Sequence, residues 1–367
     1  MILPKKKMLL AVGIIIALIV ISFLWIQFSG NNNPENNELE SLDVNSSERL
    51  PFVKLTVLEK TDCVECISLQ PLVDSIKFEF DVNVLDVKTI DSASAEGQDL
   101  IKMHNIKFLP VVIVNGEFDG TDLQLLWSEI GTEKNGVLIQ TKGFPPYYSL
   151  EEKRLVGKVN ILHIINSSCE ECIDLSFFAS DLNELGVLVG EEKTIEFDSI
   201  EGKDLLDFYL IDRIPTVLLS GDISEYEYLS SIWTQIGSIE ADGIYIFNEA
   251  VPYYDLFSGE TKGLVEVIKL VDLNCSECME ADTLMLPLNE MQMKIVKETI
   301  IDVSSEEGKA LIEKYLIQAV PTIIVSAEAE EYLDFFVLWP ELGSQEEDGS
   351  FVFRNLEVVG QPFKTLE

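Results

Sequence analysis

The pattern Cys-x-Glu-Cys occurs three times in this chain of 367 residues, and each copy begins 106 residues after the previous one. The three copies contain every cysteine of the sequence: Cys63, Cys66, Cys169, Cys172, Cys275 and Cys278. One CxxC alone is a weak motif. Three copies at a domain-sized spacing indicate a tandem repeat, and each repeat carries a vicinal dithiol. The length alone would suit two or three domains, and the spacing favours three, here called repeats 1, 2 and 3.

The first residues form a separate segment. A cluster of lysines at positions 5–7 precedes an apolar run from Met8 to Phe28, which is long enough to cross a bilayer core of about 30 Å as a helix. A cleaved secretory signal is the alternative, but its apolar part is usually shorter, and no cleavage site of small residues follows Phe28. We therefore predict an uncleaved single-pass anchor, with the lysines in the cytoplasm and the repeats outside, where disulfides persist.

The composition and the spacing of the repeats divide the whole chain into segments. We predict a membrane anchor at 1–30, a polar linker at 31–50, and domains at 51–154, 155–260 and 261–367.

The net charge of −38, from 64 acidic against 26 basic residues, excludes nucleic acid as a partner because its phosphates would be repelled. A solvated acidic surface explains this charge, and weak binding of divalent cations is the alternative.

The order of elements is the same in each repeat. An apolar strand leads into the CxxC; these strands are Phe52–Leu58, Val159–Ile165 and Val265–Val271. A segment with helical spacing, a second strand and a second helix follow, and this helix opens at Glu96-Gly97, Glu201-Gly202 or Glu307-Gly308. Fourteen residues after each of those glutamates stands a proline, namely Pro110, Pro215 or Pro321. A strand-like run comes next, so the order predicts an α/β fold with a sheet covered by helices.

The last third of each repeat is less regular. Trp127, Trp233 and Trp339 occupy equivalent positions, and we interpret them as core residues rather than as ligand platforms. Pro146-Tyr147-Tyr148 and Pro252-Tyr253-Tyr254 are interpreted as joints between repeats.

This order of elements resembles the thioredoxin-like superfamily. The segment Ile312–Val325 is similar to the thioredoxin segment that leads into a cis-proline, and the resemblance covers roughly the first two-thirds of each repeat. It implies three tandem thioredoxin-like domains after the transmembrane helix, each with a central mixed β-sheet flanked by helices. It also implies a redox-active CxxC at a helix N-terminus, facing a cis-proline loop that holds the backbone of the substrate.

The resemblance assigns roles to residues of this chain. The cis-prolines would be Pro110, Pro215 and Pro321. The attacking cysteines would be Cys63, Cys169 and Cys275. The resolving cysteines would be Cys66, Cys172 and Cys278. Six residues before the first cysteine, where thioredoxins have a buried aspartate, this chain has Val57, His163 and Lys269.

The residues around each CxxC suggest how the helix starts. Before the first cysteine stand Asp62, Ser168 and Asn274, which are good N-cap residues. Three residues later stand Glu65, Glu171 and Glu277, which we interpret as capping-box partners rather than as catalytic groups. The helix N-terminus would favour the thiolate, whereas the carboxylate would oppose it. We therefore predict comparatively stable disulfides, and a potential near or above about −120 mV would refute this.

These patterns predict a membrane-anchored, extracytoplasmic thiol–disulfide oxidoreductase without a cofactor or a metal. Its partners would be protein thiols and disulfides, together with an unidentified electron donor or acceptor such as a membrane redox protein. The first alternative is a zinc site. Because a closed site needs four ligands and the only histidines are His104 and His163, two repeats would have to face each other. The second alternative is an acidic, redox-inert thioredoxin-repeat scaffold that binds proteins or divalent cations.

Overall fold

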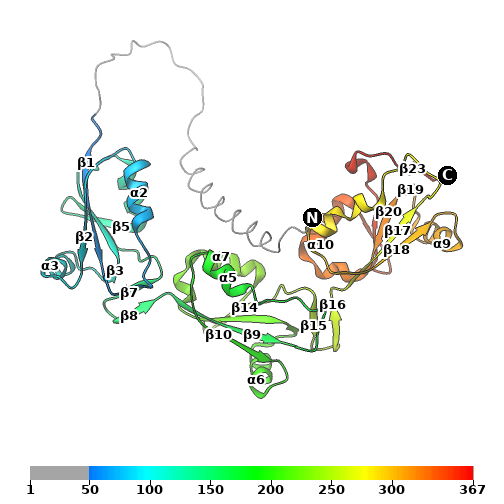
Figure 1. Ribbon diagram of the computed structural model, residues 1–367, viewed down its shortest axis with the longest axis horizontal. Helices are drawn as coiled ribbons and strands as arrows, with labels where there is room; N and C mark the ends of the chain where they lie inside the picture. The colour runs from blue at the N-terminus through cyan, green and yellow to red at the C-terminus, as the bar shows by residue number, and fades with distance from the viewer. Residues whose placement is uncertain (1–48, 367) are drawn as a thin grey trace, which may run out of the picture. The chain divides into compact units, whose positions relative to one another are not determined.

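The computed structural model describes residues 49–366. The predicted anchor and all but the end of the predicted linker lie outside this range. Between residues 49 and 366, no helix has both the length and the apolar character that a membrane span requires. Each repeat forms its own five-stranded sheet with helices against it (Figure 1).

By proximity, the described residues form two compact bodies. The first comprises residues 49–161 with Phe177–Glu192 and Leu219–Ser231, and the second comprises the remainder. The division passes through repeat 2, although the sheet of repeat 2 is continuously hydrogen-bonded. Each repeat therefore has one continuous sheet of its own.

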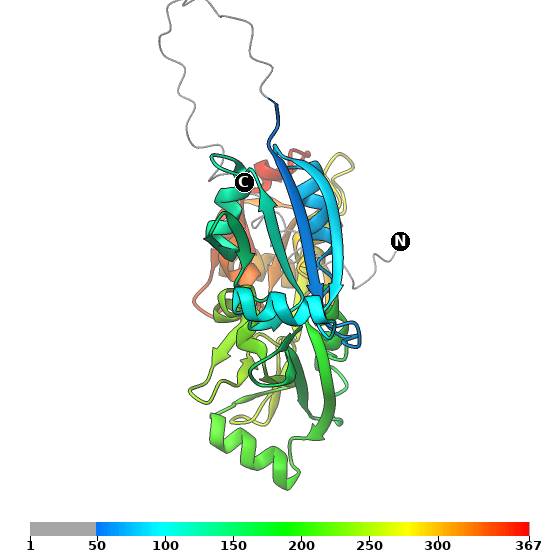
Figure 2. The ribbon, with the colours of Figure 1, turned by 90° about the vertical axis from the view of Figure 1, so that its left-hand side faces the viewer.

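The sheet of repeat 1 is mixed, as the resemblance implied. Its strand order is β2-β1-β4-β6-β5, and β1 runs parallel to β2 but antiparallel to β4. Figure 2 shows the long strands β1 and β2 side by side. The bounds are β1 (Phe52–Glu59), β2 (Asn83–Asp91), β4 (Val111–Gly116), β5 (Gly131–Lys134) and β6 (Val137–Gln140).

Helices cover both faces of this sheet. Val57 and Leu58 are neighbours on β1, so they point to opposite faces, and they belong to two different core clusters. The helices α2 (Gln70–Phe78) and α4 (Asp122–Ile130) pack on the face of Val57, and α3 (Ala95–His104) packs on the face of Leu58. Figure 1 shows α2 and α3 on opposite sides of the sheet.

Repeats 2 and 3 follow the same plan. In repeat 2 the elements are β9 (Lys158–Ile165), α5 (Phe178–Glu184), β10 (Leu188–Glu196), α6 (Ile200–Tyr209), β12 (Thr216–Gly221), α7 (Glu227–Ile236), β13 (Gly237–Ile239) and β14 (Tyr245–Phe247). In repeat 3 they are β17 (Val265–Val271), η2 (Ala281–Met285), α8 (Leu286–Glu290), β18 (Ile295–Asp302), α9 (Glu306–Tyr315), β20 (Thr322–Val325), α10 (Leu333–Leu342), β21 (Gly343–Gln345) and β22 (Phe351–Phe353). The 3-10 turns η1 (Ile223–Glu225) and η3 (Ala327–Glu331) precede α7 and α10, and η4 (Leu356–Val359) follows β22.

The recurring Glu-Gly pair has a structural explanation. It lies in the first turn of α3, α6 and α9, as predicted, and a serine hydroxyl caps each helix by accepting the glycine N–H. A Cβ on these glycines would lie 2.1–2.3 Å from a carbonyl oxygen of the preceding strand or its end. Only glycine therefore lets the helix approach that strand so closely. The glycines are Gly97, Gly202 and Gly308.

The three tryptophans are core residues, as predicted. Trp127, Trp233 and Trp339 are 1%, 2% and 3% exposed. They lie on α4, α7 and α10, where they pack against the sheet of their own repeat.

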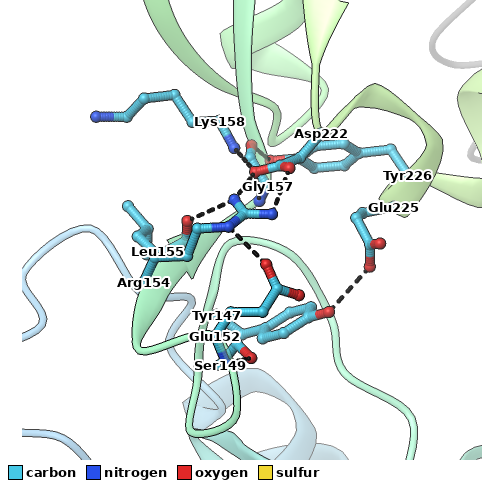
Figure 3. A network of polar contacts seen from close by, with 10 residues as sticks. All are labelled: Tyr147, Ser149, Glu152, Arg154, Leu155, Gly157, Lys158, Asp222, Glu225 and Tyr226. Atoms are coloured by element: carbon cyan, nitrogen blue, oxygen red, sulfur yellow. Dashed lines mark hydrogen bonds and ion pairs between the residues drawn. The ribbon is translucent and has the colours of Figure 1, made fainter. Parts of the chain in front are cut away.

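The segment after repeat 1 is fixed by side chains of repeat 2, as Figure 3 shows. Asp222 accepts the backbone N–H of Gly157 (2.9 Å) and two N–H groups of Arg154 (2.7 and 3.0 Å). Burial opposes ionisation of Asp222, but these hydrogen bonds outweigh it and lower its pKa. The Tyr226 hydroxyl donates to the Gly157 carbonyl (2.6 Å). Both polar groups of Gly157 are therefore satisfied by repeat 2.

The same contacts recur 106 residues later. Gly263 donates to Glu328 (2.6 Å) and accepts from the Tyr332 hydroxyl (2.8 Å). In both places a tyrosine hydroxyl also donates to a glutamate of the next repeat, in the pairs Tyr147–Glu225 (3.0 Å) and Tyr253–Glu331 (2.9 Å). The predicted boundaries at 154 and 260 fall inside the strands β8 (Arg154–Val156) and β16 (Glu260–Lys262), so the sheets divide at Gly157 and Gly263 instead.

Candidate active site

Each CxxC lies in a turn that follows the first strand of its repeat. All three pairs are disulfides, with Cα–Cα distances of 5.4–5.5 Å. All six cysteines are half-buried, so exposure does not separate the predicted attacking cysteines from the resolving ones.

The predicted helix start at the CxxC is wrong. Helix α2 begins at Gln70 and α5 at Phe178, and the turn η2 begins at Ala281, several residues after the second cysteine in each case. Therefore Asp62, Ser168 and Asn274 are not N-caps, and Glu65, Glu171 and Glu277 do not close a capping box. Two of these glutamates form ion pairs instead, Glu65 with Lys158 (3.5 Å) and Glu171 with Lys294 (2.7 Å).

The backbone explains why the helix starts late. The N–H of the first cysteine closes a tight turn, for example from Cys63 to the Lys60 carbonyl (2.9 Å). The N–H of the residue after the second cysteine is bonded to a distant proline carbonyl, in the pairs Ile67–Pro146 (2.7 Å), Ile173–Pro252 (2.9 Å) and Met279–Pro362 (2.8 Å). This second bond holds the segment outside the helix. The helix dipole therefore starts beyond the dithiol and cannot act on it at the closest range.

The cis-prolines and the dithiols lie together. The peptide bonds before Pro110, Pro215 and Pro321 are cis, as the resemblance implied. In repeat 1, Cys63, Cys66 and Pro110 line one hollow of about 240 Å³. In repeat 2, Cys172 Sγ lies 3.9 Å from the carbonyl oxygen of Ile214, the residue before Pro215. In repeats 1 and 2 the structure thus brings predicted site residues together, and their roles in binding and exchange stay predictions.

The residue six positions before the first cysteine differs between the three repeats. Val57, His163 and Lys269 are 8%, 4% and 6% exposed, so all three belong to the interior, as predicted for His163. In repeat 1, Val57 lines the same hollow as the cysteines, together with Gln70 and Val87. The equivalents of Gln70 and Val87 in repeat 3 are Asp282 and Glu298, and both accept hydrogen bonds from the Lys269 ammonium.

Lys269, Asp282 and Glu298 form a hydrogen-bonded cluster of charged side chains in repeat 3. Burial alone would lower the pKa of Lys269, but the hydrogen bonds to Asp282 and Glu298 outweigh it and raise this pKa above its ordinary value. Repeat 3 therefore has a buried cation and two carboxylates at the positions where repeat 1 has Val57, Gln70 and Val87, which line the hollow of the first dithiol.

We expect Lys269→Met to slow the alkylation of Cys275 at pH 7 by about tenfold, because the two carboxylates left without their cation would disfavour the thiolate. Iodoacetamide labelling of the reduced chain, read by mass spectrometry of each cysteine, measures this. Lys309→Met removes an exposed charge from the same repeat and should leave the rate unchanged. Unchanged or faster labelling of Cys275 in Lys269→Met would show that the cluster does not act on the dithiol.

Sequence reasoning missed one element of the site, a short strand beside each cis-proline. The strands β7 (Tyr147–Ser149), β15 (Tyr253–Asp255) and β23 (Lys364–Thr365) pair antiparallel with β3 (Phe108–Leu109), β11 (Arg213–Ile214) and β19 (Ala319–Val320). In each case the residue before the cis-proline has a partner on this strand. The two Pro-Tyr-Tyr segments interpreted as joints are therefore part of the site of their own repeat. A pattern Pro-aromatic-x-x-Leu at Pro146, Pro252 and Pro362 was the available signal.

No metal cluster accompanies the dithiols in the described part of the chain, where no three His, Cys, Asp or Glu side chains are grouped so that they could hold an ion.

Comparisons with known proteins place few constraints on this chain. No protein-family model matches it. No curated protein matches it either. Among solved structures, ERdj5 form II is 13% identical over 80% of this chain, with a TM-score of 0.15. Human ERp44 form I is 12% identical over 80% of this chain, also with a TM-score of 0.15. The alkylhydroperoxide reductase subunit AhpF of Enterococcus faecalis is 18% identical over 46% of this chain, with a TM-score of 0.16.

The chain spans 40% of the length of ERdj5, 79% of ERp44 and 82% of AhpF. TM-scores this low carry no weight for the arrangement of the whole chain. This chain's own features define mixed α/β domains, each with a CxxC disulfide after its first strand and a cis-proline directly before a later strand of the same sheet.

Proposed function

We propose that this protein is a membrane-anchored thiol–disulfide oxidoreductase that exchanges disulfides with protein substrates outside the cytoplasm. The observation that carries the proposal is the hollow of repeat 1, which is lined by both half-buried cysteines of the CxxC and by the cis-proline Pro110. A purely structural disulfide requires neither an open hollow nor a cis-proline loop. A disulfide that takes part in exchange requires space for the sulfur of a substrate to approach along its S–S axis.

The exchange can be written for repeat 1. The thiolate of reduced Cys63 attacks a substrate disulfide, so a Cys63–substrate bond forms and the other substrate sulfur leaves as a thiolate. Cys66 then attacks Cys63, releases the second substrate sulfur and leaves the Cys63–Cys66 disulfide. Two electrons pass to the substrate. A dithiol partner restores the reduced pair, and the reverse sequence oxidises the substrate.

The location is part of the proposal and rests on the sequence. The lysines at 5–7 and the apolar run Met8–Phe28 favour an anchor with the repeats on the far side of the membrane. A cysteine-specific, membrane-impermeant reagent added to intact cells tests this. It should label Cys63 after mild reduction, whereas labelling only after lysis would place the repeats inside.

Turnover of a protein disulfide tests the activity. The full chain in detergent should reduce insulin with dithiothreitol, or reactivate scrambled ribonuclease in a glutathione buffer. Variants that retain a single CxxC assign the activity to a repeat. Absence of activity in every variant and in both assays would favour the redox-inert scaffold.

A further inference from the structure

The two cysteines of repeat 2 face different hydrogen-bonding groups. The hydroxyl oxygen of Thr261 lies 3.6 Å from Cys169 Sγ. A disulfide sulfur carries no proton, so the hydroxyl is the donor in this contact. Cys172 Sγ instead lies 3.9 Å from the carbonyl oxygen of Ile214, a group that only accepts hydrogen bonds. The structure therefore places a donor at the first sulfur and an acceptor at the second.

One row of the small sheet of repeat 2 supplies both groups. The strands of this sheet are β11, β15 and β16, and Ile214, Tyr254 and Thr261 are direct register partners across them. Residues directly opposite each other on antiparallel strands have their side chains on the same face of the sheet. The row therefore runs from the residue before the cis-proline to the hydroxyl beside Cys169.

The strand that carries Thr261 is fixed at both ends. In the turn before it, the N–H of Gly259 donates to the Asp255 carbonyl (2.9 Å), and the Asp255 carboxylate accepts the N–H of Ser258 (2.6 Å). After it, side chains of repeat 3 satisfy both polar groups of Gly263, as described above. A threonine side chain is stiff about its only heavy-atom torsion, so a fixed backbone also restricts the position of its hydroxyl group.

Repeat 1 lacks this donor. Leu155 of β8 is opposite Tyr148, just as Thr261 of β16 is opposite Tyr254, so Leu155 and Thr261 occupy equivalent positions. A leucine side chain has no group that donates a hydrogen bond. The hydroxyl is therefore a feature of repeat 2 and not a requirement of the three-stranded sheet.

We propose that Thr261 is a further catalytic residue, whose hydroxyl stabilises the thiolate of Cys169 and so makes it the attacking cysteine of repeat 2. The proposal rests on the proposed function, because it names a group that supports disulfide exchange. A hydrogen bond to a charged acceptor is stronger than one to a neutral acceptor, so the hydroxyl favours the thiolate over the thiol. The Ile214 carbonyl has the opposite effect on Cys172, which stays protonated. Glu171, inside the same CxxC, opposes the thiolate less because it is paired with Lys294 (2.7 Å).

The hydroxyl acts at each step in which Cys169 carries the charge. When a substrate is reduced, the Cys169 thiolate bonds to one substrate sulfur, and the other leaves as a thiolate. Cys172 then gives its proton to water, attacks Cys169 and releases the second substrate sulfur, so two electrons pass to the substrate. When a substrate is oxidised, the steps run backwards, and Cys169 is the thiolate that leaves the mixed disulfide. Thr261 keeps its proton throughout.

Iodoacetamide labelling of the reduced full chain, read at each cysteine by mass spectrometry over a range of pH, tests the proposal. Thr261→Val removes the hydroxyl at nearly constant volume, so Cys169 should be labelled about tenfold more slowly at pH 7, with its pH profile moved to higher pH. Thr261→Ala should have the same effect. Thr261→Ser keeps a hydroxyl and should keep the original rate. Cys63 should keep its rate in all three variants.

The midpoint potential of the Cys169–Cys172 pair is a second measurement. Loss of a hydrogen bond to the thiolate favours the disulfide, so Thr261→Val should make the midpoint more negative. For a tenfold change in the exchange equilibrium with glutathione, the shift is about 30 mV. Thr261→Ser should again match the unaltered chain.

Three results would overturn the proposal. Cys169 keeps its labelling rate and its potential in both Thr261→Val and Thr261→Ala, or Thr261→Ser is as slow as Thr261→Val, or Cys172 is labelled faster than Cys169 in the unaltered chain. Neither measurement requires turnover of a protein disulfide. A chain that shows the Thr261 effect but never reduces insulin would contradict the proposed function alone, and the reverse result would contradict this proposal alone.

Discussion

Serine in place of the first cysteine of all three pairs is expected to abolish exchange with a protein disulfide, down to the uncatalysed rate. The changed residues are Cys63, Cys169 and Cys275. The attacking species is a thiolate, and a serine hydroxyl cannot replace it near neutral pH. Serine in place of the second cysteines should instead leave long-lived mixed disulfides, because no neighbouring thiol can release the substrate. Insulin turnover measures the first effect, and mass spectrometry of non-reduced chains measures the second.

The residues between the cysteines provide a matched control. Val64→Ala, Glu170→Ala and Ser276→Ala change exposed side chains inside the same three turns. This triple variant should keep most of its activity. If the variant with serine at all three first cysteines reduces insulin as fast as this control does, the assignment of the attacking cysteines is wrong.

Trp233→Ala is expected to destabilise repeat 2 by about 3–5 kcal/mol, because it empties a large core volume. The side chain is 2% exposed, and its N–H donates to the Ile246 carbonyl at 3.1 Å. Thermal unfolding followed by tryptophan and tyrosine fluorescence measures the loss. Phe257→Ala removes a side chain that is 98% exposed and should change stability by no more than about 0.5 kcal/mol.

A comparison of two tryptophans separates packing from hydrogen bonding. Among the described residues, the buried N–H of Trp127 has no hydrogen-bond partner, unlike that of Trp233. Trp233→Phe should therefore cost more than Trp127→Phe, by about the 1 kcal/mol of a hydrogen bond. Equal costs of the two phenylalanine variants would contradict a stabilising hydrogen bond at Trp233, and a loss below about 1 kcal/mol in Trp233→Ala would contradict its role as a core residue.

The strands could be predicted because their signals are local, whereas the cis-prolines were implied by the family resemblance. Apolar runs such as Val265–Val271 match β17, and the Glu-Gly pairs mark helices α3, α6 and α9. The burial of the tryptophans followed from their equivalent positions in the three repeats.

The start of the helix after each CxxC could not be predicted, because the same residues satisfy two local structures. Residues such as Asp, Asn and Ser cap helices, but they also close tight turns. Here Asp272 accepts the N–H of Asn274 (2.9 Å), and Asn166 accepts that of Ser168 (3.1 Å). The deciding contact, from Ile67 to Pro146, joins residues far apart in the sequence.

The strand beside the dithiol of repeat 3 was hidden by a shift in spacing. A strict period of 106 residues from Pro252 leads to Val358, whereas the equivalent proline is Pro362, after the extra turn η4. The segment Pro362–Leu366 therefore did not align with its two relatives.

The redox titration of the three CxxC pairs against glutathione, with each pair resolved by mass spectrometry, tests the central claim most directly. If the pairs exchange with protein substrates, each should be reduced reversibly while the fold persists, with a midpoint between about −300 and −120 mV. A pair that stays oxidised beyond the reach of glutathione, below about −300 mV, would be a structural disulfide. That result in all three repeats would contradict the assignment of this chain as a thiol–disulfide oxidoreductase.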